Sequence, residues 1–221
     1  MGKRGLKGTG IIKGVLFDFD GTLTSPGAID FPAIKREMGC PPDQPILEFL
    51  AAQPPERRAQ LMAILEKNEE KAAEMSRPNK GAEQCLSALK ERGMLLGVLT
   101  RNSLKSVEKA IARFNGIGMD TFDVVITRDE TPPKPHPDGV LKAARRLDLK
   151  AEELLMVGDF RFDVMAGKAA GAPTVLLIND GVSPMRPGDP EPDFTITHLK
   201  ELLNILSEKV LPPPVGFNGG H

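Results

Sequence analysis

The sequence VLFDFDGT, at residues 15–22, joins a short apolar run to two carboxylates and a glycine. The apolar part predicts a buried strand of a parallel sheet, because such strands are covered on both faces. Asp18 and Asp20 follow two residues apart, so their side chains point to the same side of an extended chain. Two close carboxylates repel each other unless a cation or a shared proton compensates them. The pair is therefore a candidate site, although solvated acids at the start of a loop explain it equally well in isolation.

Along the rest of the chain, short apolar runs alternate with amphipathic segments, which is typical of a parallel sheet flanked by helices. Strands are predicted at residues 15–18, 95–99, 122–126, 154–157 and 174–178, with an edge strand at 194–196. Helices are predicted at residues 82–91, 103–113, 137–147, 163–170 and 198–206. The predicted fold class is therefore α/β, with a doubly wound, Rossmann-like parallel sheet as its core.

One stretch, residues 25–77, breaks this alternation because several prolines interrupt it and it contains no convincing strand. Its pattern predicts helices at 31–38, 45–52 and 55–76. The first half of the last helix is apolar, whereas its second half, EKNEEKAAEMSR, is charged and is expected to be solvated.

The economical explanation of this stretch is an inserted all-helical cap at 25–77. The α/β catalytic core is then discontinuous and comprises residues 1–24 and 78–221. The alternative is that the helices simply pack on the core. The cap carries no recognisable motif, and its candidate charges for substrate contact are Lys35, Arg36 and Arg57.

Two further stretches place groups suited to phosphate after predicted strands. In LTRNS, Thr100 and Arg101 stand between a strand and a helix, where a hydroxyl and free backbone N–H groups can bind a phosphoryl group. Lys134 lies in the loop TPPKPHPD, whose prolines restrict the backbone and could hold one ammonium group in place. Each stretch alone also has an ordinary structural explanation, as a helix start or a proline-rich linker.

Two more acids, Asp159 and Asp163, follow another apolar run in the sequence MVGDFRFD. The carboxyl ends of parallel strands meet at one edge of a sheet, so these acids are expected beside Asp18, Asp20 and Lys134. Several carboxylates suit a hard cation such as Mg²⁺, which takes its remaining oxygen ligands from water and phosphate. The lysine and the cation would neutralise phosphoryl oxygens and leave one carboxylate free to attack phosphorus.

Taken together, these motifs resemble those of the haloacid dehalogenase superfamily of phosphohydrolases, over residues 14–181. The helical insert is similar to the cap of its phosphoglycolate phosphatase-like branch. The resemblance rests on the order and spacing of Asp18-Phe-Asp20-Gly21-Thr22-Leu23, Thr100, Lys134-Pro135-His136-Pro137-Asp138, and Val157-Gly158-Asp159 followed by Asp163. Phe160 departs from the pattern, because a small hydroxyl residue is common at that position in the family.

The resemblance implies a role for each carboxylate. Asp18 would be the nucleophile that forms an aspartyl-phosphate. Asp20 would protonate the leaving alcohol and then activate water. Mg²⁺ would be held by Asp18, the main-chain carbonyl of Asp20, and Asp159, with Asp163 in support.

The resemblance also assigns the phosphate-binding groups. Thr100, the backbone amides of Arg101 and Phe19, and Lys134 would bind the phosphoryl group.

Three alternatives to a Mg²⁺-dependent phosphatase remain open at this stage. A phosphomutase uses the same aspartyl-phosphate but returns the phosphoryl group to another hydroxyl, and Thr22 leans towards hydrolysis instead. A receiver-type signalling domain also has an acidic cluster, a Thr and a Lys, but is about half as long and has no inserted cap. A catalytically inactive binding module would not need all four site elements.

Composition narrows the expected partners. The 221 residues carry 29 Lys+Arg against 30 Asp+Glu, and a net charge of −1 argues against a nucleic-acid binder. No apolar run reaches the length of a membrane span, the first ten residues lead into no signal-peptide core, and the last eleven are expected to be a frayed tail. Cys40 and Cys85 are interpreted as reduced thiols of a cytoplasmic protein. The expected partner is a small phosphorylated metabolite, and the oligomeric state, monomer or homodimer, stays open.

The chain has neither Trp nor Tyr but has 10 Phe. Any ring stacking on a substrate must therefore come from Phe, with Phe31, Phe49, Phe160 and Phe162 as candidates. Recognition is expected to depend mainly on charge and hydrogen bonds, which favours small anionic phosphate esters over nucleotides.

Overall fold

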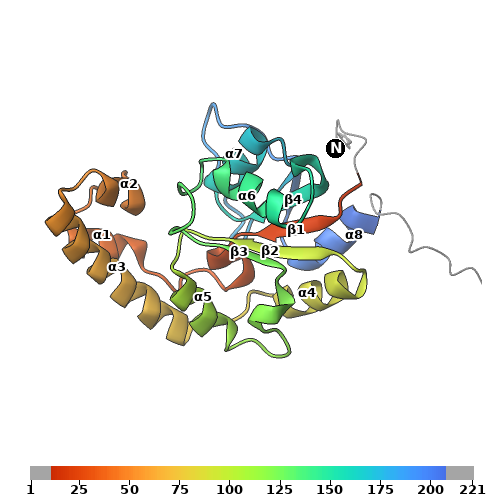
Figure 1. The fold of residues 1–221 in the computed structure, drawn as a ribbon, viewed down its shortest axis with the longest axis horizontal. Coiled ribbons are helices and arrows are strands. Elements are labelled where there is room, and N and C mark those ends of the chain that lie inside the picture. The colour runs from red at the N-terminus through yellow and green to blue at the C-terminus, as the bar shows by residue number, and fades with distance from the viewer. Residues whose placement is uncertain (1–10, 208–221) are drawn as a thin grey trace, which may run out of the picture.

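The computed structural model describes residues 11–207, so the expectations for the first ten residues and for the tail lie outside the described residues. Its centre is one sheet of six parallel strands in the order β3-β2-β1-β4-β5-β6 (Figure 1). The strands are β1 (Gly14–Phe17), β2 (Leu95–Leu99), β3 (Val124–Ile126), β4 (Leu154–Gly158), β5 (Thr174–Leu177) and β6 (Phe194–Ile196). This sheet confirms the predicted α/β, doubly wound class.

The strand order places a switch point between β1 and β4. The chain winds outward from β1 through β2 to β3 in one direction and through β4 to β6 in the other. Phe17 is in register with Val98 of β2 and with Val157 of β4, so these three strands end at the same level. Open α/β sheets bind their ligands at such a point, outside the carboxyl ends of the strands.

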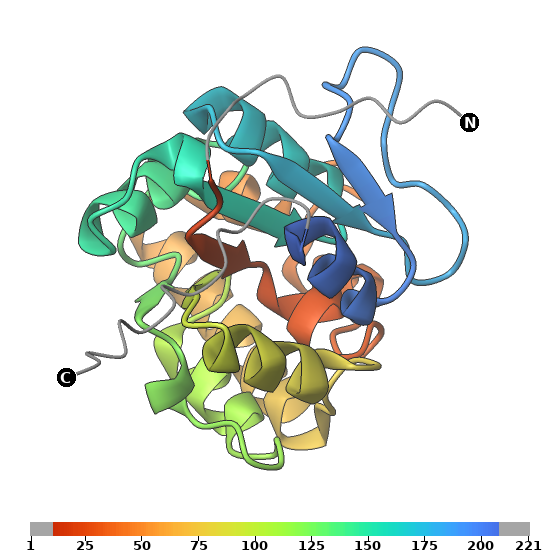
Figure 2. The ribbon, with the colours of Figure 1, turned by 90° about the vertical axis from the view of Figure 1, so that its right-hand side faces the viewer.

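Helices cover both faces of the sheet, as Figures 1 and 2 show. On one face, Val15 and Phe17 pack in a cluster with residues of α4 (Ala82–Glu91), α5 (Leu104–Ile111) and α8 (Leu202–Ser207). On the other face, Leu16 packs with residues of α6 (Asp138–Arg146) and α7 (Arg161–Ala170). Successive side chains of β1 therefore enter different layers, which explains why the strand is apolar throughout.

Local sequence signals set several helix ends. Ser103 caps α5 by accepting a hydrogen bond from the N–H of Ser106, and α7 ends at Gly171 with φ of 80°. The helix predicted at 198–206 is present, but its first turn is 3₁₀: η4 (Leu199–Glu201) leads directly into α8. The physical reason is local, because the Glu201 carboxylate accepts from the N–H groups of Thr197 and His198 and tightens that turn. Two further 3₁₀ turns are η2 (Met119–Thr121) and η3 (Ala151–Glu153).

The segment after β1 is helical, with α1 (Phe31–Met38), α2 (Ile46–Ala51) and α3 (Pro55–Met75). These helices share a hydrophobic cluster that is separate from the two clusters of the sheet; it contains Ile34, Met38, Cys40, Ile46, Leu50, Leu61 and Leu65. Figure 1 shows the three helices extending to one side of the sheet. Division of the chain into a cap at 25–77 and a core stays a prediction.

The chain enters and leaves this helical segment at two neighbouring stretches of backbone. Thr24 forms an antiparallel bridge with Pro78, and the N–H of Ser25 donates to the carbonyl of Arg77 at 2.8 Å. The two ends of the helical segment therefore lie side by side, next to the end of β1.

The prediction that the second half of α3 is solvated is wrong in part. Ala72, Ala73 and Glu69 are buried, because this half of α3 packs along α5. Glu70, at the edge of the same contact, forms ion pairs with Lys105 and Lys109 of α5. The charged sequence reflects partners on another helix as well as contact with water. Among the described residues, no helix combines the length and the apolar character needed to cross a bilayer.

Candidate active site

The chain makes one wide turn directly after β1, over Phe19–Leu23, and this turn carries Asp20. Gly21 has φ of 79°, and a Cβ added to it would lie 2.2 Å from Oδ2 of Asp159. Both the turn and the close approach of Asp159 therefore require glycine here. Asn179 fixes the turn by donating from Nδ2 to the carbonyl of Gly21 at 2.7 Å, and Asn79 donates to the same carbonyl at 3.0 Å.

Lys134, in the loop after β3, connects two of the carboxylates. Its ammonium group donates to Oδ1 of Asp18 and, at 2.6 Å, to Oδ1 of Asp163. Burial lowers the pKa of Lys134, but the charges of Asp163 and Asp18 outweigh burial and raise it overall. Lys134 is therefore a fixed positive charge that lies between two acids.

The acidic side chains at the ends of β1 and β4 lie close together. One oxygen from each of Asp18, Asp159 and Asp163 lies within 4.8 Å of the others. Burial, followed by the charges of Asp18 and Asp163, raises the pKa of Asp159 to about 8. Burial also raises the pKa of Asp163 to about 6, against the lowering effect of Lys134. One lysine does not balance this much negative charge, and the oxygen donor set is the kind that Mg²⁺ binds.

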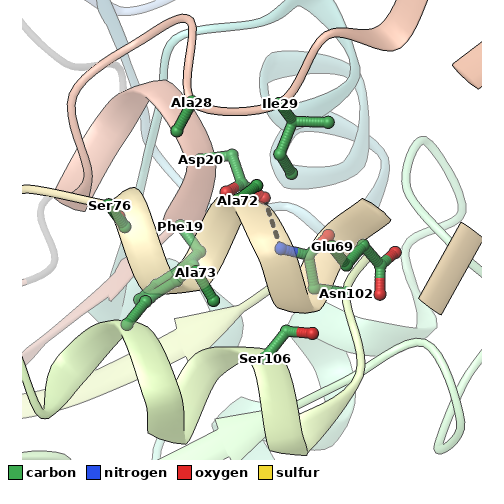
Figure 3. A pocket seen from close by; sticks show the side chains of 11 residues that line it. Phe19, Asp20, Ala28, Ile29, Glu69, Ala72, Ala73, Ser76, Asn102 and Ser106 are labelled. Atoms are coloured by element: carbon green, nitrogen blue, oxygen red, sulfur yellow. Dashed lines mark hydrogen bonds between the residues drawn. The ribbon is translucent and has the colours of Figure 1, made fainter. Parts of the chain in front are cut away.

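Asp20 lies in a different environment from that of Asp18. Its Oδ2 accepts a hydrogen bond of 2.6 Å from Nδ2 of Asn102, drawn in Figure 3. The same figure shows its side chain close to Ile29, which precedes α1, and to Ala72 of α3; all three line a cavity of about 10 Å³ that has room for about one water. Burial, more than the nearby charge of Asp18, raises the pKa of Asp20 to about 7.

The side chains of Arg101 and Thr100 are bonded to other protein groups than the acids of the cluster. The Arg101 guanidinium forms two hydrogen bonds with the Glu48 carboxylate of α2, at 2.6 and 3.1 Å, and a third with the carbonyl of Lys134. It also lies over the ring of Phe162, 5.3 Å from its centre. Thr100 is buried at the end of β2, where its hydroxyl accepts from the N–H of Asn102 at 3.1 Å.

A cavity of about 350 Å³ opens above the sheet edge and brings most of the predicted residues together. Its lining includes six of the seven predicted site residues, namely Asp18, Asp20, Arg101, Lys134, Asp159 and Asp163. Thr100 lies behind this lining. From the candidates for substrate contact, Phe31, Lys35, Phe160 and Phe162 line the cavity, whereas Arg36, Phe49 and Arg57 do not.

Four residues that help to hold this site were not predicted from the sequence, namely the amides Asn102 and Asn179 and the acids Glu48 and Glu69. Asn102 lies within the LTRNS stretch, so its position between Thr100 and the helix start was a usable signal. Glu48 and Glu69 gave no signal, because nothing local identifies the arginines that they contact. Asn179 lies just after the end of a predicted strand, which is also the position of the predicted site acids.

A doubly wound parallel sheet with acids and a buried lysine at its switch point is the arrangement of an α/β enzyme with its site at the strand ends. The chain belongs to the haloacid dehalogenase-like hydrolase family, which it matches over residues 24–177. It is accordingly an enzyme, a hydrolase of the phosphatase type. This membership confirms the resemblance drawn from the motifs and decides against a receiver-type domain.

Individual relatives cover most of the chain. An uncharacterized hydrolase of Saccharomyces cerevisiae is 35% identical over 178 residues, which are 80% of this chain and 82% of the relative. The N-acetylmuramic acid 6-phosphate phosphatase of Pseudomonas aeruginosa is 28% identical and covers 88% of this chain and 95% of its own. A solved structure, described as a predicted phosphoglycolate phosphatase from Haemophilus somnus, has a TM-score of 0.67 at 21% identity; it covers 88% of this chain and 97% of its own.

Proposed function

We propose that the chain is a Mg²⁺-dependent phosphatase that hydrolyses a small phosphate monoester through an aspartyl-phosphate on Asp18. The observation that carries the proposal is the contrast between two neighbouring carboxylates. Lys134 compensates the charge of Asp18, whereas burial gives Asp20 a pKa of about 7. One carboxylate is thus suited to act as a nucleophile and the other to hold or release a proton near neutral pH.

The two carboxylates act in sequence. Lys134 donates to Oδ1 of Asp18, so the other oxygen is the one that attacks phosphorus as the P–O bond to the alcohol breaks. Asp20, when protonated, gives its proton to the departing oxygen. The resulting carboxylate then takes a proton from the water that attacks the aspartyl-phosphate, which regenerates Asp18 and releases inorganic phosphate.

The phosphoryl group is bound by a cation and by neutral donors. The ammonium group of Lys134 already pairs with a carboxylate oxygen of Asp18 and with one of Asp163. From this position its positive charge also offsets the negative charge of the phosphoryl group. We assign further contacts to the Thr100 hydroxyl and to the backbone N–H of Arg101, both in the connection between β2 and α5. The Arg101 side chain has no part in this, because Glu48 already binds it.

The carboxylates of Asp18, Asp159 and Asp163 and the main-chain carbonyl of Asp20 fit a hard dication. One oxygen from each of the three carboxylates lies within 4.8 Å of the others, and burial together with the neighbouring acids raises the pKa of Asp159 and of Asp163. When bound, Mg²⁺ supplies charge neutralisation for the phosphoryl oxygens.

The helical segment at 25–77 is proposed as the cap over this site. Residues of α1, α2 and α3 form one side of the cavity, opposite the acids at the strand ends. We place the enzyme in the cytoplasm, with a small phosphorylated metabolite as its partner and no nucleic acid or membrane. The relative named as an N-acetylmuramic acid 6-phosphate phosphatase supports the choice of a small phosphorylated metabolite.

Phosphate release from p-nitrophenyl phosphate tests the proposal. Release is expected to need Mg²⁺, to stop with EDTA, and to fall at least a thousandfold in Asp18→Asn, because loss of a nucleophile removes the main route. Asp43→Asn, an exposed acid of the helical segment, is the matched control and is expected to keep its activity.

The covalent step has its own readout. In Asp20→Ala, hydrolysis of the intermediate is slowed, so acid-quenched protein should carry a phosphoryl group on Asp18 that mass spectrometry can locate. Activity that survives Asp18→Asn in pure protein contradicts the nucleophile assignment. A requirement for a bisphosphorylated sugar, without net phosphate release, would identify a phosphomutase instead.

A further inference from the structure

The cavity extends well beyond the acids, and its farther part is apolar. Its volume of about 350 Å³ exceeds what one phosphoryl group needs, so the remainder holds the group to which the phosphate is attached. The helical segment supplies Phe31, Ile46, Leu47 and Leu65 to that part, and Phe160 and Phe162 come from the end of the β4–α7 connection and the first turn of α7.

The aromatic rings form part of this wall in a defined arrangement. Phe160 and Phe162 meet edge to face, with ring centres 5.1 Å apart and planes at 88°. Phe160 and Phe31 are 44% and 46% exposed, so both rings offer apolar surface that a bound hydrocarbon group can cover.

The cations on the wall are already engaged. Arg101 is bonded to both oxygens of Glu48 and to the carbonyl of Lys134. The ammonium group of Lys35 donates to the carbonyl of Pro42 at 2.6 Å. Among the described lining residues outside the acidic cluster, no other side chain is positive, so a second phosphate or a carboxylate on the substrate would meet two cations that already have partners and a wall of apolar side chains.

Hydroxyl groups find no hydrogen-bonding partner among the apolar side chains of this wall. A polyol placed against phenylalanine, leucine and isoleucine gives up hydrogen bonds to water and gains none in return. A hydrocarbon chain or ring gains from the same wall, and each buried methylene group strengthens binding by about fourfold.

We propose that this enzyme is specific for phosphate monoesters whose alcohol is a compact hydrocarbon chain or ring, rather than a polyol or an alcohol that carries a second anionic group. The proposal rests on the proposed phosphatase function of the same cavity. It replaces the expectation that charge and hydrogen bonds dominate recognition, since the composition gave no sign of how the apolar residues of α1 to α3 are placed.

A chain-length series tests the specificity with little change in the leaving group. Values of kcat/KM are measured with Mg²⁺ for ethyl, butyl and hexyl phosphate, for benzyl phosphate, and for glucose 6-phosphate and phosphoglycolate. All are esters of primary alcohols. We expect kcat/KM to rise by about fourfold per methylene along the series until the cavity is full. We expect benzyl phosphate to match the longer alkyl esters, and glucose 6-phosphate and phosphoglycolate to fall below ethyl phosphate.

A pair of variants locates the effect. Leu47 lines the cavity, whereas Ile64 packs against the same cluster of the helical segment and does not line it; both are partly buried. Leu47→Asn should flatten the dependence on chain length, and Ile64→Asn should keep it. If both variants fail to fold, the series on the wild-type enzyme still decides.

The outcomes separate this inference from the proposed function. Mg²⁺-dependent release that is independent of chain length, or fastest with glucose 6-phosphate or phosphoglycolate, overturns the specificity and leaves the phosphatase intact. Release from none of the esters overturns the phosphatase and the specificity together. An unchanged chain-length slope in a folded Leu47→Asn variant also contradicts the assignment of this wall.

Discussion

At the scale of single residues, the site depends on giving different environments to side chains of one type. Asp18 is bonded to a buried ammonium group, whereas Asp20 is bonded to a neutral amide and lies close to Ile29 and α3. The neutral amide does not cancel the cost of burying a charge, so the pKa of Asp20 lies well above the usual value for an aspartate. The sequence pattern Asp-x-Asp locates both residues but says nothing of this difference.

Asn102 is expected to control the pH range of activity. Burial and the charges of Asp18 and Glu69 raise the pKa of Asp20, and the hydrogen bond from Asn102 and the charge of Lys134 lower it. An enzyme that needs protonated Asp20 loses kcat/KM as pH rises through this pKa. Asn102→Ala removes a group that stabilises the ionised form, so the alkaline limb should move upward, on the order of one pH unit.

The measurement is a pH profile of kcat/KM at saturating Mg²⁺. Ser106→Ala is a suitable control, because Ser106 borders the same small cavity but bonds to Ser103 instead of Asp20. A downward shift of the limb in Asn102→Ala would contradict the role of Asp20 as the acid.

At the scale of elements, two arginines of the sheet edge bind two helices of the inserted segment. Arg101, after β2, binds Glu48 of α2, and Arg128, after β3, binds Glu69 of α3. The second pair is almost fully buried, with both side chains 3% exposed. The helix that carries Glu69 was predictable from its sequence, but its contacts were not, because Arg128 lies in a different element far along the chain.

Glu69 and Glu70 offer a test of these contacts on one helix. Glu69→Ala leaves the Arg128 charge buried without its main partner, which should lower the free energy of unfolding by about 3–5 kcal/mol. Glu70→Ala removes ion pairs that are exposed to solvent and should change stability little. Urea denaturation of the two variants and the wild type measures both values. Equal effects would mean that the buried pair does not anchor α3.

At the scale of the whole molecule, the order of strands determines which residues meet. Asp18 follows β1 and Asp159 follows β4, two strands that are distant in sequence but adjacent in the sheet. All six strands were predictable, because each is a short apolar run between turn signals. It was also predictable that the residues after these strands lie close together, because the carboxyl ends of parallel strands meet at one edge of a sheet. The orientation of the helical segment did not follow, since it depends on packing of α3 against α5 and on the two arginine contacts.

Folding therefore brings together the acids that we propose as a dication site, and a dication that binds only the folded chain should stabilise it. Mg²⁺ is expected to raise the Tm of the wild type. The pKa of Asp159 is raised to about 8 by folding, so its ionisation weakens the metal-free protein as pH rises from about 4 to about 8. Asp159→Asn removes this loss, and its metal-free Tm should exceed that of the wild type by an amount that grows over the same pH range.

Scanning calorimetry with EDTA and with excess MgCl₂ measures both effects. Asp159→Asn should also lose most of the increase in Tm caused by Mg²⁺, whereas Asp43→Asn should keep it. A variant that melts below the wild type in EDTA at pH 8, or that retains the full Mg²⁺ effect, would show that Asp159 does not contribute to the site as described.

The bridge between Thr24 and Pro78 has a consequence for how the molecule can be altered. The two ends of the helical segment leave the sheet at neighbouring backbone positions, with Ser25 and Arg77 joined by a hydrogen bond of 2.8 Å. The core therefore spans the same short gap whatever length of chain is inserted there. We expect replacement segments from other family members to be accepted at this junction without lengthening any loop of the sheet, so that the proposed cap can be exchanged while the acids at the strand ends stay in place.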